Sequence, residues 1–387
     1  MRVVIVGAGI GGLTAALSLR RDGHEVEVLE VASALGEVGA GIQMSPNGSR
    51  VLHELGLAGE LAAIGTTPER IVMRRWHDDH ELIATPMGHH ALERWHSPYF
   101  SIYRPDLIDI LRRACGDLPI RFGARVTGVD QADGHVDVAL SDDTRVSADI
   151  VVGADGIHSA VRTALMGPQQ TRFSGYVAYR ALVPREAIEH FPNEATNRVG
   201  PDAHVVTYFV GRDRRYLNVV AISGDPSWDV ESWNEPGDPA VMRDRFADWA
   251  PTLRDLLQRV QEPMFRWALH DRQPLARWSH GRVTLLGDAC HPMLPFMAQG
   301  ACQAIEDAAA LRTCLATTDN AVAALAAYES LRLERTADVQ QRSFANATTF
   351  HLPDGPEQVQ RDEIFGLMAG AGADALGMFD WLYAAPG

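Results

Sequence analysis

The chain has 387 residues, of which 46% are apolar and 22% are charged, and its formal net charge is -15 at pH 7. This length exceeds what one hydrophobic core usually organises, so two closely connected domains are expected. The negative charge is spread without a long run of one sign, which disfavours nucleic acids and anionic membranes as partners by simple repulsion.

The sequence contains no run of about 18 apolar residues that would predict a membrane-spanning helix. The N-terminus enters an apolar strand directly, without a charged and cleavable leader, so a cytoplasmic location is expected. Four cysteines without a metal-ligand spacing predict buried thiols, with neither a disulfide framework nor a metal site. They are Cys115, Cys290, Cys302 and Cys314.

The first 30 residues predict a strand, a glycine-rich turn, a helix and a second strand. Gly7 permits the tight turn, Gly9 lets a pyrophosphate approach the backbone, and Gly12 lets the helix pack on the strand. The phosphates would lie at the helix N-terminus. Glu30, 18 residues after Gly12, is placed to accept hydrogen bonds from an adenosine ribose. The unit predicts dinucleotide binding and leaves FAD and NAD open.

Further strands are expected over residues 136–140 and 150–152, with a hairpin turn at Asp142 and Asp143. Short strands rich in valine and tyrosine then predict an antiparallel sheet in a domain of its own. They cover residues 176–183, 205–210 and 216–222. A buried strand over 283–286 and a helix over 301–315 return the chain to the nucleotide-binding part.

Two more segments belong with the glycine-rich turn: Gly153-Ala154-Asp155-Gly156-Ile157-His158-Ser159 and Gly287-Asp288-Ala289-Cys290-His291-Pro292. With Tyr103-Arg104-Pro105-Asp106-Leu107, this set resembles the FAD-dependent aromatic hydroxylases over nearly the whole chain. The resemblance implies that Asp155 lies in a segment that contacts FAD and the nicotinamide, that Asp288 binds the ribityl chain, and that Arg104 approaches the flavin. Taken singly, Asp155 also fits a turn, Asp288 a helix cap and Arg104 a surface ion pair.

The loop that ends at Gly300 and Ala301 feeds a helix start, whose N-H groups and positive dipole end would stabilise negative charge on the flavin ring. The region is closest to hydroxylases of 6-hydroxynicotinate and 3-hydroxybenzoate, and salicylate hydroxylases are slightly more distant. Gln43 and Phe296 stand where the hydroxynicotinate enzymes carry histidines, which argues against 6-hydroxynicotinate as the substrate. His291 fits packing beside the loop better than general-base catalysis.

The substrate pocket is expected on the antiparallel sheet, where period two puts His204, Val206 and Tyr208 on one face. The histidine and tyrosine resemble the pair that the related hydroxylases present to the ring hydroxyl of the substrate, where they would favour phenolate over phenol. A purely structural role is the alternative. Three further pocket candidates are Tyr176, Tyr179 and Arg180. The arginine suits either a substrate carboxylate or an ion pair within the protein.

The resemblance implies an α/β fold with a Rossmann-like, three-layer FAD-binding domain and an inserted antiparallel β-sheet substrate domain. The FAD-binding domain would comprise residues 1–71, 98–172 and 270–350, the sheet domain 73–97 and 173–269, and a C-terminal helical segment 351–387. NADH or NADPH would reduce FAD transiently, and a flavin C4a-hydroperoxide formed with O2 would hydroxylate a small aromatic acid, with or without loss of its carboxylate. The protein would be a monomer or a homodimer. The alternatives are a hydroxylase or epoxidase of a larger polycyclic or polyketide substrate, and a non-catalytic flavin-binding redox sensor.

Overall fold

A computed structural model describes residues 1–36, 39–188, 190–228, 230, 235–370 and 372–385 of the chain. Its first layer is a five-stranded sheet in the order β17-β11-β1-β2-β7, and every neighbouring pair in it is parallel. The strands are β1 (Arg2–Val6), β2 (Glu25–Glu30), β7 (Ile120–Phe122), β11 (Ile150–Gly153) and β17 (Val283–Leu285). Because helices and a second sheet cover both faces, β1 and β11 are nearly continuous apolar runs, whereas β2 keeps glutamates at positions 25, 27 and 30.

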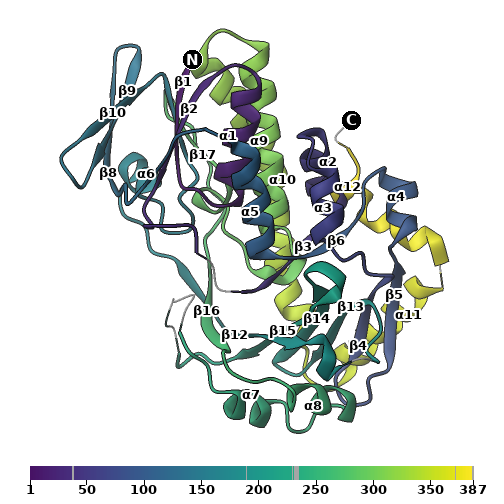
Figure 1. Cartoon of the computed structure of the whole chain (residues 1–387). Coiled ribbons are helices and arrows are strands. Elements are labelled where there is room, and N and C mark those ends of the chain that lie inside the picture. The colour runs from purple at the N-terminus through teal and green to yellow at the C-terminus, as the bar shows by residue number, and fades with distance from the viewer. Residues whose placement is uncertain (37–38, 189, 229, 231–234, 371, 386–387) are drawn as a thin grey trace.

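Two further layers enclose this parallel sheet (Figure 1). One face carries helices α1 (Ile10–Arg21), α5 (Arg104–Cys115), α9 (Gly300–Thr317) and the long α10 (Ala321–Phe350). The other carries an antiparallel sheet of β8 (Val126–Ala132), β9 (His135–Leu140) and β10 (Arg145–Ala148), next to the short helix α6 (Ala160–Met166). The three-layer α/β fold predicted for the dinucleotide-binding part is confirmed, as is the turn at Asp142 and Asp143. The second strand of that hairpin is β10, which was not predicted, because residues 150–152 belong to the parallel sheet as β11.

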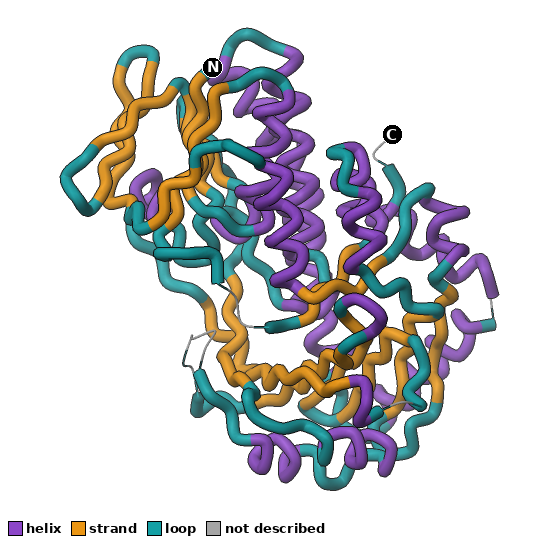
Figure 2. Tube along the Cα trace, viewed as in Figure 1, coloured by secondary structure: helices purple, strands orange, loops and turns teal. Residues whose placement is uncertain are grey.

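The second large sheet has seven strands in the order β16-β12-β15-β14-β13-β4-β5, and only β13 and β4 run parallel. Figure 2 shows it well separated from the parallel sheet. Its strands are β4 (Arg70–Arg75), β5 (Glu81–Pro86), β12 (Arg172–Pro184), β13 (Glu194–Gly200), β14 (Ala203–Val210), β15 (Tyr216–Gly224) and β16 (Phe265–Asp271). Helices α7 (Pro239–Arg245) and α8 (Pro251–Leu257) cover its outer face. Since β4 begins at Arg70, the sheet takes in residues that the predicted division leaves in the FAD-binding part, and the remaining domain limits stay predictions.

Smaller elements connect the two sheets. Strand β3 (Gly41–Met44) pairs with β6 (Phe100–Tyr103). Helices α2 (Pro46–Glu54) and α3 (Ala58–Ile64) follow β3, and α4 (His89–Trp95) precedes β6. Short 3-10 turns are η1 (Arg185–Ala187), η2 (Arg212–Arg214), η3 (Gly287–Ala289), η4 (Pro295–Met297) and η5 (Gly372–Phe379). Helices α11 (Pro356–Ala369) and α12 (Asp380–Tyr383) complete the chain, and Leu382 and Tyr383 are buried against the body.

All four cysteines are free and buried, as predicted. Within the described ranges, no helix is both long and apolar enough to cross a membrane.

Candidate active site

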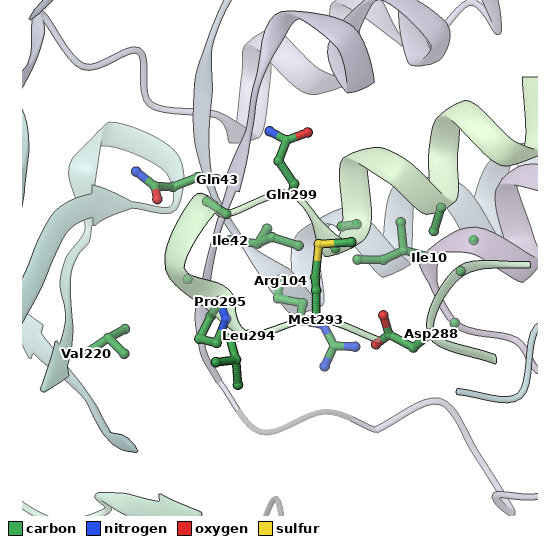
Figure 3. Close-up of a pocket in the computed structure, with 18 of the residues that line it drawn as sticks. Ile10, Ile42, Gln43, Arg104, Val220, Asp288, Met293, Leu294, Pro295 and Gln299 are labelled. Atoms are coloured by element: carbon green, nitrogen blue, oxygen red, sulfur yellow. The ribbon is translucent and has the colours of Figure 1, made fainter. Parts of the chain in front are cut away.

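A cavity of about 330 Å³ opens where the glycine-rich turn, the segment from η3 to the start of α9, and the inner face of the seven-stranded sheet meet. Figure 3 shows residues of all three parts around it, with Arg104 and Asp288 close together and Val220 on the side of the sheet. Its lining includes ten of the predicted site residues: Gly9, Gln43, Arg104, Arg180, His204, Val206, Tyr208, Asp288, Gly300 and Ala301. The fold therefore brings predicted cofactor and substrate residues to one place.

The glycine-rich turn is too tight for side chains at two of its three positions. A Cβ on Gly7, whose φ is +106°, would lie 2.3 Å from the carbonyl oxygen of Ala154, and one on Gly12 would lie 2.0 Å from that of Gly7. A Cβ on Gly9 would meet no atom within 4 Å, because Gly9 faces the cavity. This open backbone surface at the start of α1 suits the close approach of a pyrophosphate.

Glu30 and Asp155, two acids predicted to bind the cofactor, make hydrogen bonds within the protein and are not among the described residues that line the cavity. The Glu30 carboxylate accepts from the backbone N-H of Ala8 at 2.7 Å and of Ala32 at 2.8 Å, so it ties the end of β2 to the glycine-rich turn. Asp155 accepts from Ser159 Oγ at 2.5 Å and from the N-H of Ala160 at 2.7 Å, at the start of α6. Their roles in holding a cofactor stay predictions.

Asp288 is the acid that opens into the cavity. Its surroundings of protein raise its pKa by desolvation, while the nearby charges of His291 and Arg104 oppose that shift. The turn that carries it is fixed from behind by Asp307, which accepts from the N-H of Gly287 at 3.0 Å and lies 2.6 Å from His291 Nε2. His291 is fully buried, as expected for a packing residue.

Side chains from three strands form the substrate side of the cavity. Arg180 of β12 lies opposite Val220 of β15, which lies opposite Val206 of β14. His204 and Tyr208 flank Val206 at positions two residues away on the same face. Burial raises the pKa of Tyr208 to about 12, although the charge of Arg180 opposes this. Tyr208 is therefore a neutral hydroxyl donor at ordinary pH.

Arg180 lies over the Trp267 ring at 4.0 Å, which fixes its guanidinium at the cavity wall by a cation-π contact. Burial lowers its pKa to about 10, so it stays cationic at neutral pH. A cation beside Tyr208 suits an anionic ring substituent.

The prediction that Tyr179 contributes to the pocket is wrong. In β12 its neighbour Arg180 faces the cavity, so Tyr179 faces the opposite side, where it is buried against α7 and α8 and lies 5.3 Å from the guanidinium of Arg266.

Tyr176 and Phe296 are not among the described residues that line the cavity, so direct contact of either with a substrate stays a prediction. Their rings pack against each other with centroids 6.0 Å apart, and the Phe296 ring lies 5.0 Å from the His204 ring. Phe296 is buried because η4 turns it toward the sheet and the end of α10. Phe296 thus packs against the cavity wall at His204, and Tyr176 packs against Phe296.

His351 was missed by sequence reasoning. It follows the last residue of α10, and its Nε2 lies 2.6 Å from Nδ1 of His204. The two histidines are 147 residues apart in the chain, so neither a motif nor a period could have joined them.

The residues around the cavity fit FAD. The glycine cradle would take the pyrophosphate, Asp288 has an acceptor carboxylate open to the cavity for a polyol chain, and the start of α9 offers backbone N-H groups at Gly300 and Ala301. No acidic residue occupies the first turn of α9, so its positive dipole end is uncompensated there.

A three-layer dinucleotide-binding fold that shares one cavity with an antiparallel sheet defines the class of flavin-binding enzymes. The family described as FAD binding domain matches residues 1–343, and the chain belongs to that family. Binding of FAD, predicted from the glycine-rich turn and the two later motifs, is thereby confirmed.

Among curated proteins, the chain is 39% identical over 388 residues to 3-amino-4-hydroxybenzoate 2-monooxygenase PtmB3 of Streptomyces platensis, covering 99% of this chain and 95% of that protein. It is 36% identical over 351 residues to 6-hydroxynicotinate 3-monooxygenase of Pseudomonas fluorescens, covering 89% and 91%. The predicted resemblance to aromatic hydroxylases is confirmed. The aminohydroxybenzoate enzyme, which the sequence motifs did not single out, has the higher identity of the two.

Solved structures of flavin-dependent hydroxylases share the fold of this chain. HpxO of Klebsiella pneumoniae, in complex with FAD and uric acid, has a TM-score of 0.87 and 28% identity over 100% of this chain and 97% of that one. A salicylate hydroxylase substrate complex has a TM-score of 0.82 and 26% identity over 99% and 95% of the two chains.

Proposed function

We propose that this chain is an FAD- and NAD(P)H-dependent monooxygenase that hydroxylates the ring of a small hydroxylated aromatic acid. The observation that carries the proposal is the single cavity in which Asp288 and Gly300 meet Arg180, His204 and Tyr208. Aromatic acids in the names of the relatives, such as 3-amino-4-hydroxybenzoate, support this substrate class.

The side chains on the sheet suit an acidic, hydroxylated ring. Arg180 is a cation that can pair with a carboxylate, and Val206 and Val220 offer an apolar surface for a ring face. Tyr208 and His204 lie where they can hydrogen-bond a ring oxygen and favour its ionised form. Ionisation makes the ring electron-rich, which is what attack by an electrophilic oxygen requires.

Bound FAD would supply the redox chemistry, accepting electrons from a reduced nicotinamide and activating molecular oxygen. The protein would hold it at the glycine-rich turn, Asp288 and the start of α9, and would orient the ring and exclude water. The single-ring acids in the names of the relatives favour a small ring over a polycyclic substrate. We further propose a cytoplasmic enzyme, where reduced nicotinamide is available, acting as a monomer or homodimer.

The test is substrate-stimulated NADH and NADPH oxidation by the purified yellow protein with a panel of monocyclic hydroxyaryl acids, with product identified by mass spectrometry. We expect at least one acid to accelerate oxidation and to gain one oxygen atom. Matched phenols that lack the carboxylate test the role of Arg180 and should be weaker effectors.

Three results contradict parts of the proposal. Stimulation only by polycyclic phenols would contradict the substrate class. Oxidation that yields hydrogen peroxide alone with every acid would contradict hydroxylation, and no turnover with any compound would favour a flavin-binding sensor.

A further inference from the structure

His204 and His351 form a buried pair at the wall of the cavity. Their rings are 4.9 Å apart and nearly parallel at 29°, and the 2.6 Å contact joins His204 Nδ1 to His351 Nε2. Since His204 lines the cavity and its Nδ1 is engaged, Nε2 is the ring nitrogen left to face a ligand.

Both rings are neutral at ordinary pH. Burial lowers the pKa of His204 well below 6.5, helped by the proximity of His351, and burial lowers the pKa of His351 to about 3. A neutral pair shares one proton in this hydrogen bond, so one ring donates and the other accepts. The donor determines whether His204 Nε2 carries a proton.

The surroundings of His351 decide between the two arrangements. Its Nδ1 is buried and has no hydrogen-bond partner among the described residues. Aromatic rings enclose it: that of Tyr176 lies 4.4 Å away and that of Phe296 lies 5.7 Å away. A proton on Nδ1 would be a buried donor without an acceptor, whereas a proton on Nε2 is used in the bond to His204. The proton therefore belongs on Nε2 of His351.

The other titratable or charged groups near the pair do not change this assignment. Tyr176 belongs to β12, Asp202 donates its backbone N-H to the carbonyl of His351, and Arg180 and Tyr208 line the cavity on the His204 side. Within the described residues, no carboxylate forms a hydrogen bond or an ion pair with either ring, so none there stabilises an imidazolium.

We infer that His351 is a positioning residue that holds His204 in the tautomer protonated at Nε2, so that His204 presents an N-H donor to the ring oxygen of the substrate. His204 then stabilises the ionised oxygen and does not take its proton, which passes to solvent water as the substrate binds. This assignment rests on the proposed function for the identity of the ligand.

The tautomers can be observed without a substrate. In the FAD-loaded enzyme with isotope-labelled histidine, nitrogen-proton correlation spectra identify the protonated nitrogen of each ring, and His204→Asn and His351→Gln assign the two signals. We expect Nε2-H on both rings. Nδ1-H on His204 overturns the inference, whatever the enzyme proves to hydroxylate.

A second test follows the proton with 4-hydroxy-3-nitrobenzoate, whose phenolate absorbs differently from its phenol. Below the pKa of the free phenol, we expect the bound probe to show the phenolate spectrum and a pH indicator to register release of about one proton per probe bound. A phenolate spectrum without proton release means that His204 has taken the proton. If the probe does not bind, the tautomer measurement decides alone.

A pair of variants separates positioning from packing. The amide of His351→Gln can still donate to His204 Nδ1, whereas His351→Leu fills the space without a donor. We expect the bound phenolate fraction of the probe to stay within about twofold of the wild type in the first and to fall by about tenfold in the second. His24→Gln, in the turn between α1 and β2, is the matched control. Equal loss in both His351 variants contradicts the inference.

Discussion

Tyr208 keeps its proton throughout the physiological pH range, because burial raises its pKa to about 12. A neutral hydroxyl beside the cationic Arg180 can donate to an anionic ring oxygen but cannot act as a base. With His204 in the donor tautomer, both polar groups at this end of the sheet favour the charged form of the ligand.

Tyr208→Phe should remove this donor and leave the ring volume unchanged. A hydrogen bond to a charged group contributes about 1.5–3 kcal/mol, so hydroxylation should slow by about 10- to 100-fold. Oxygen consumption should shift toward hydrogen peroxide, measured as product and peroxide formed per NADH. An unchanged yield of product per NADH would remove Tyr208 from the mechanism.

Asp288→Ala should yield protein with little bound FAD, because the variant loses the carboxylate of residues 287–292 that lines the cavity. The ratio of flavin to protein absorbance measures the loading, and circular dichroism checks that the variant is folded. A folded and fully loaded variant would contradict the assignment of Asp288 to the ribityl chain.

Among the elements, α9 and α10 hold the cofactor side of the cavity through a buried ionic cluster. Asp307 of α9 accepts from Arg332 Nε of α10 at 2.7 Å and also holds the turn that carries Asp288. Burial opposes the charge of Asp307, yet His291 and Arg332 keep its pKa at about 2. The helices and the turn therefore form one rigid support.

Asp307→Ala should lower the free energy of unfolding by about 3–5 kcal/mol, because it leaves Arg332 buried without this partner. It should also weaken FAD binding, since the N-H of Gly287 loses its acceptor. Urea unfolding and FAD titration measure the two effects. The control is Asp109→Ala, whose exposed pair with Arg113 contributes at most about 1 kcal/mol. Similar losses in both variants would argue against the cluster as a specific support.

The two halves of the molecule meet at Gly41, where β3 passes the seven-stranded sheet. Its N-H donates to Asn218 Oδ1 at 2.8 Å. A Cβ there would lie 2.6 Å from Asn218 Cγ and 2.7 Å from Tyr208 Cε2. The absence of a side chain lets the segment that carries Gln43 close over the substrate wall.

Gly41→Ala should therefore displace Tyr208 and raise the KM for the aromatic acid by about tenfold, while FAD loading stays close to that of the wild type. Steady-state kinetics and flavin absorbance measure the two quantities. Gly59→Ala in α3, where a Cβ would meet no atom within 4 Å, is the matched control. Wild-type kinetics in Gly41→Ala would show that the contact is not needed.

Local patterns predicted most of this molecule. The glycine-rich turn needs glycine for steric reasons, and the period of β14 alone put His204, Val206 and Tyr208 on one face. The same period places Tyr179 and Arg180 on opposite faces of β12, so only one of them could line the pocket. The packing of Phe296 could not be predicted, because the orientation of a short turn depends on contacts with other elements. The contact of His351 with His204 could not be predicted either, because 147 residues separate the two and no local pattern joins them.

The 30-residue helix α10 connects the two halves of the molecule, and His351 follows its last residue. At about 1.5 Å per residue, the length of the helix determines the distance between the FAD-binding part and His351. Inserting or deleting one residue in it would swing everything downstream by about 100° around the helix axis. The histidine also lies beyond residue 343, where the family match ends. A shortened chain that keeps the flavin fold intact would thus lose the ring that orients His204.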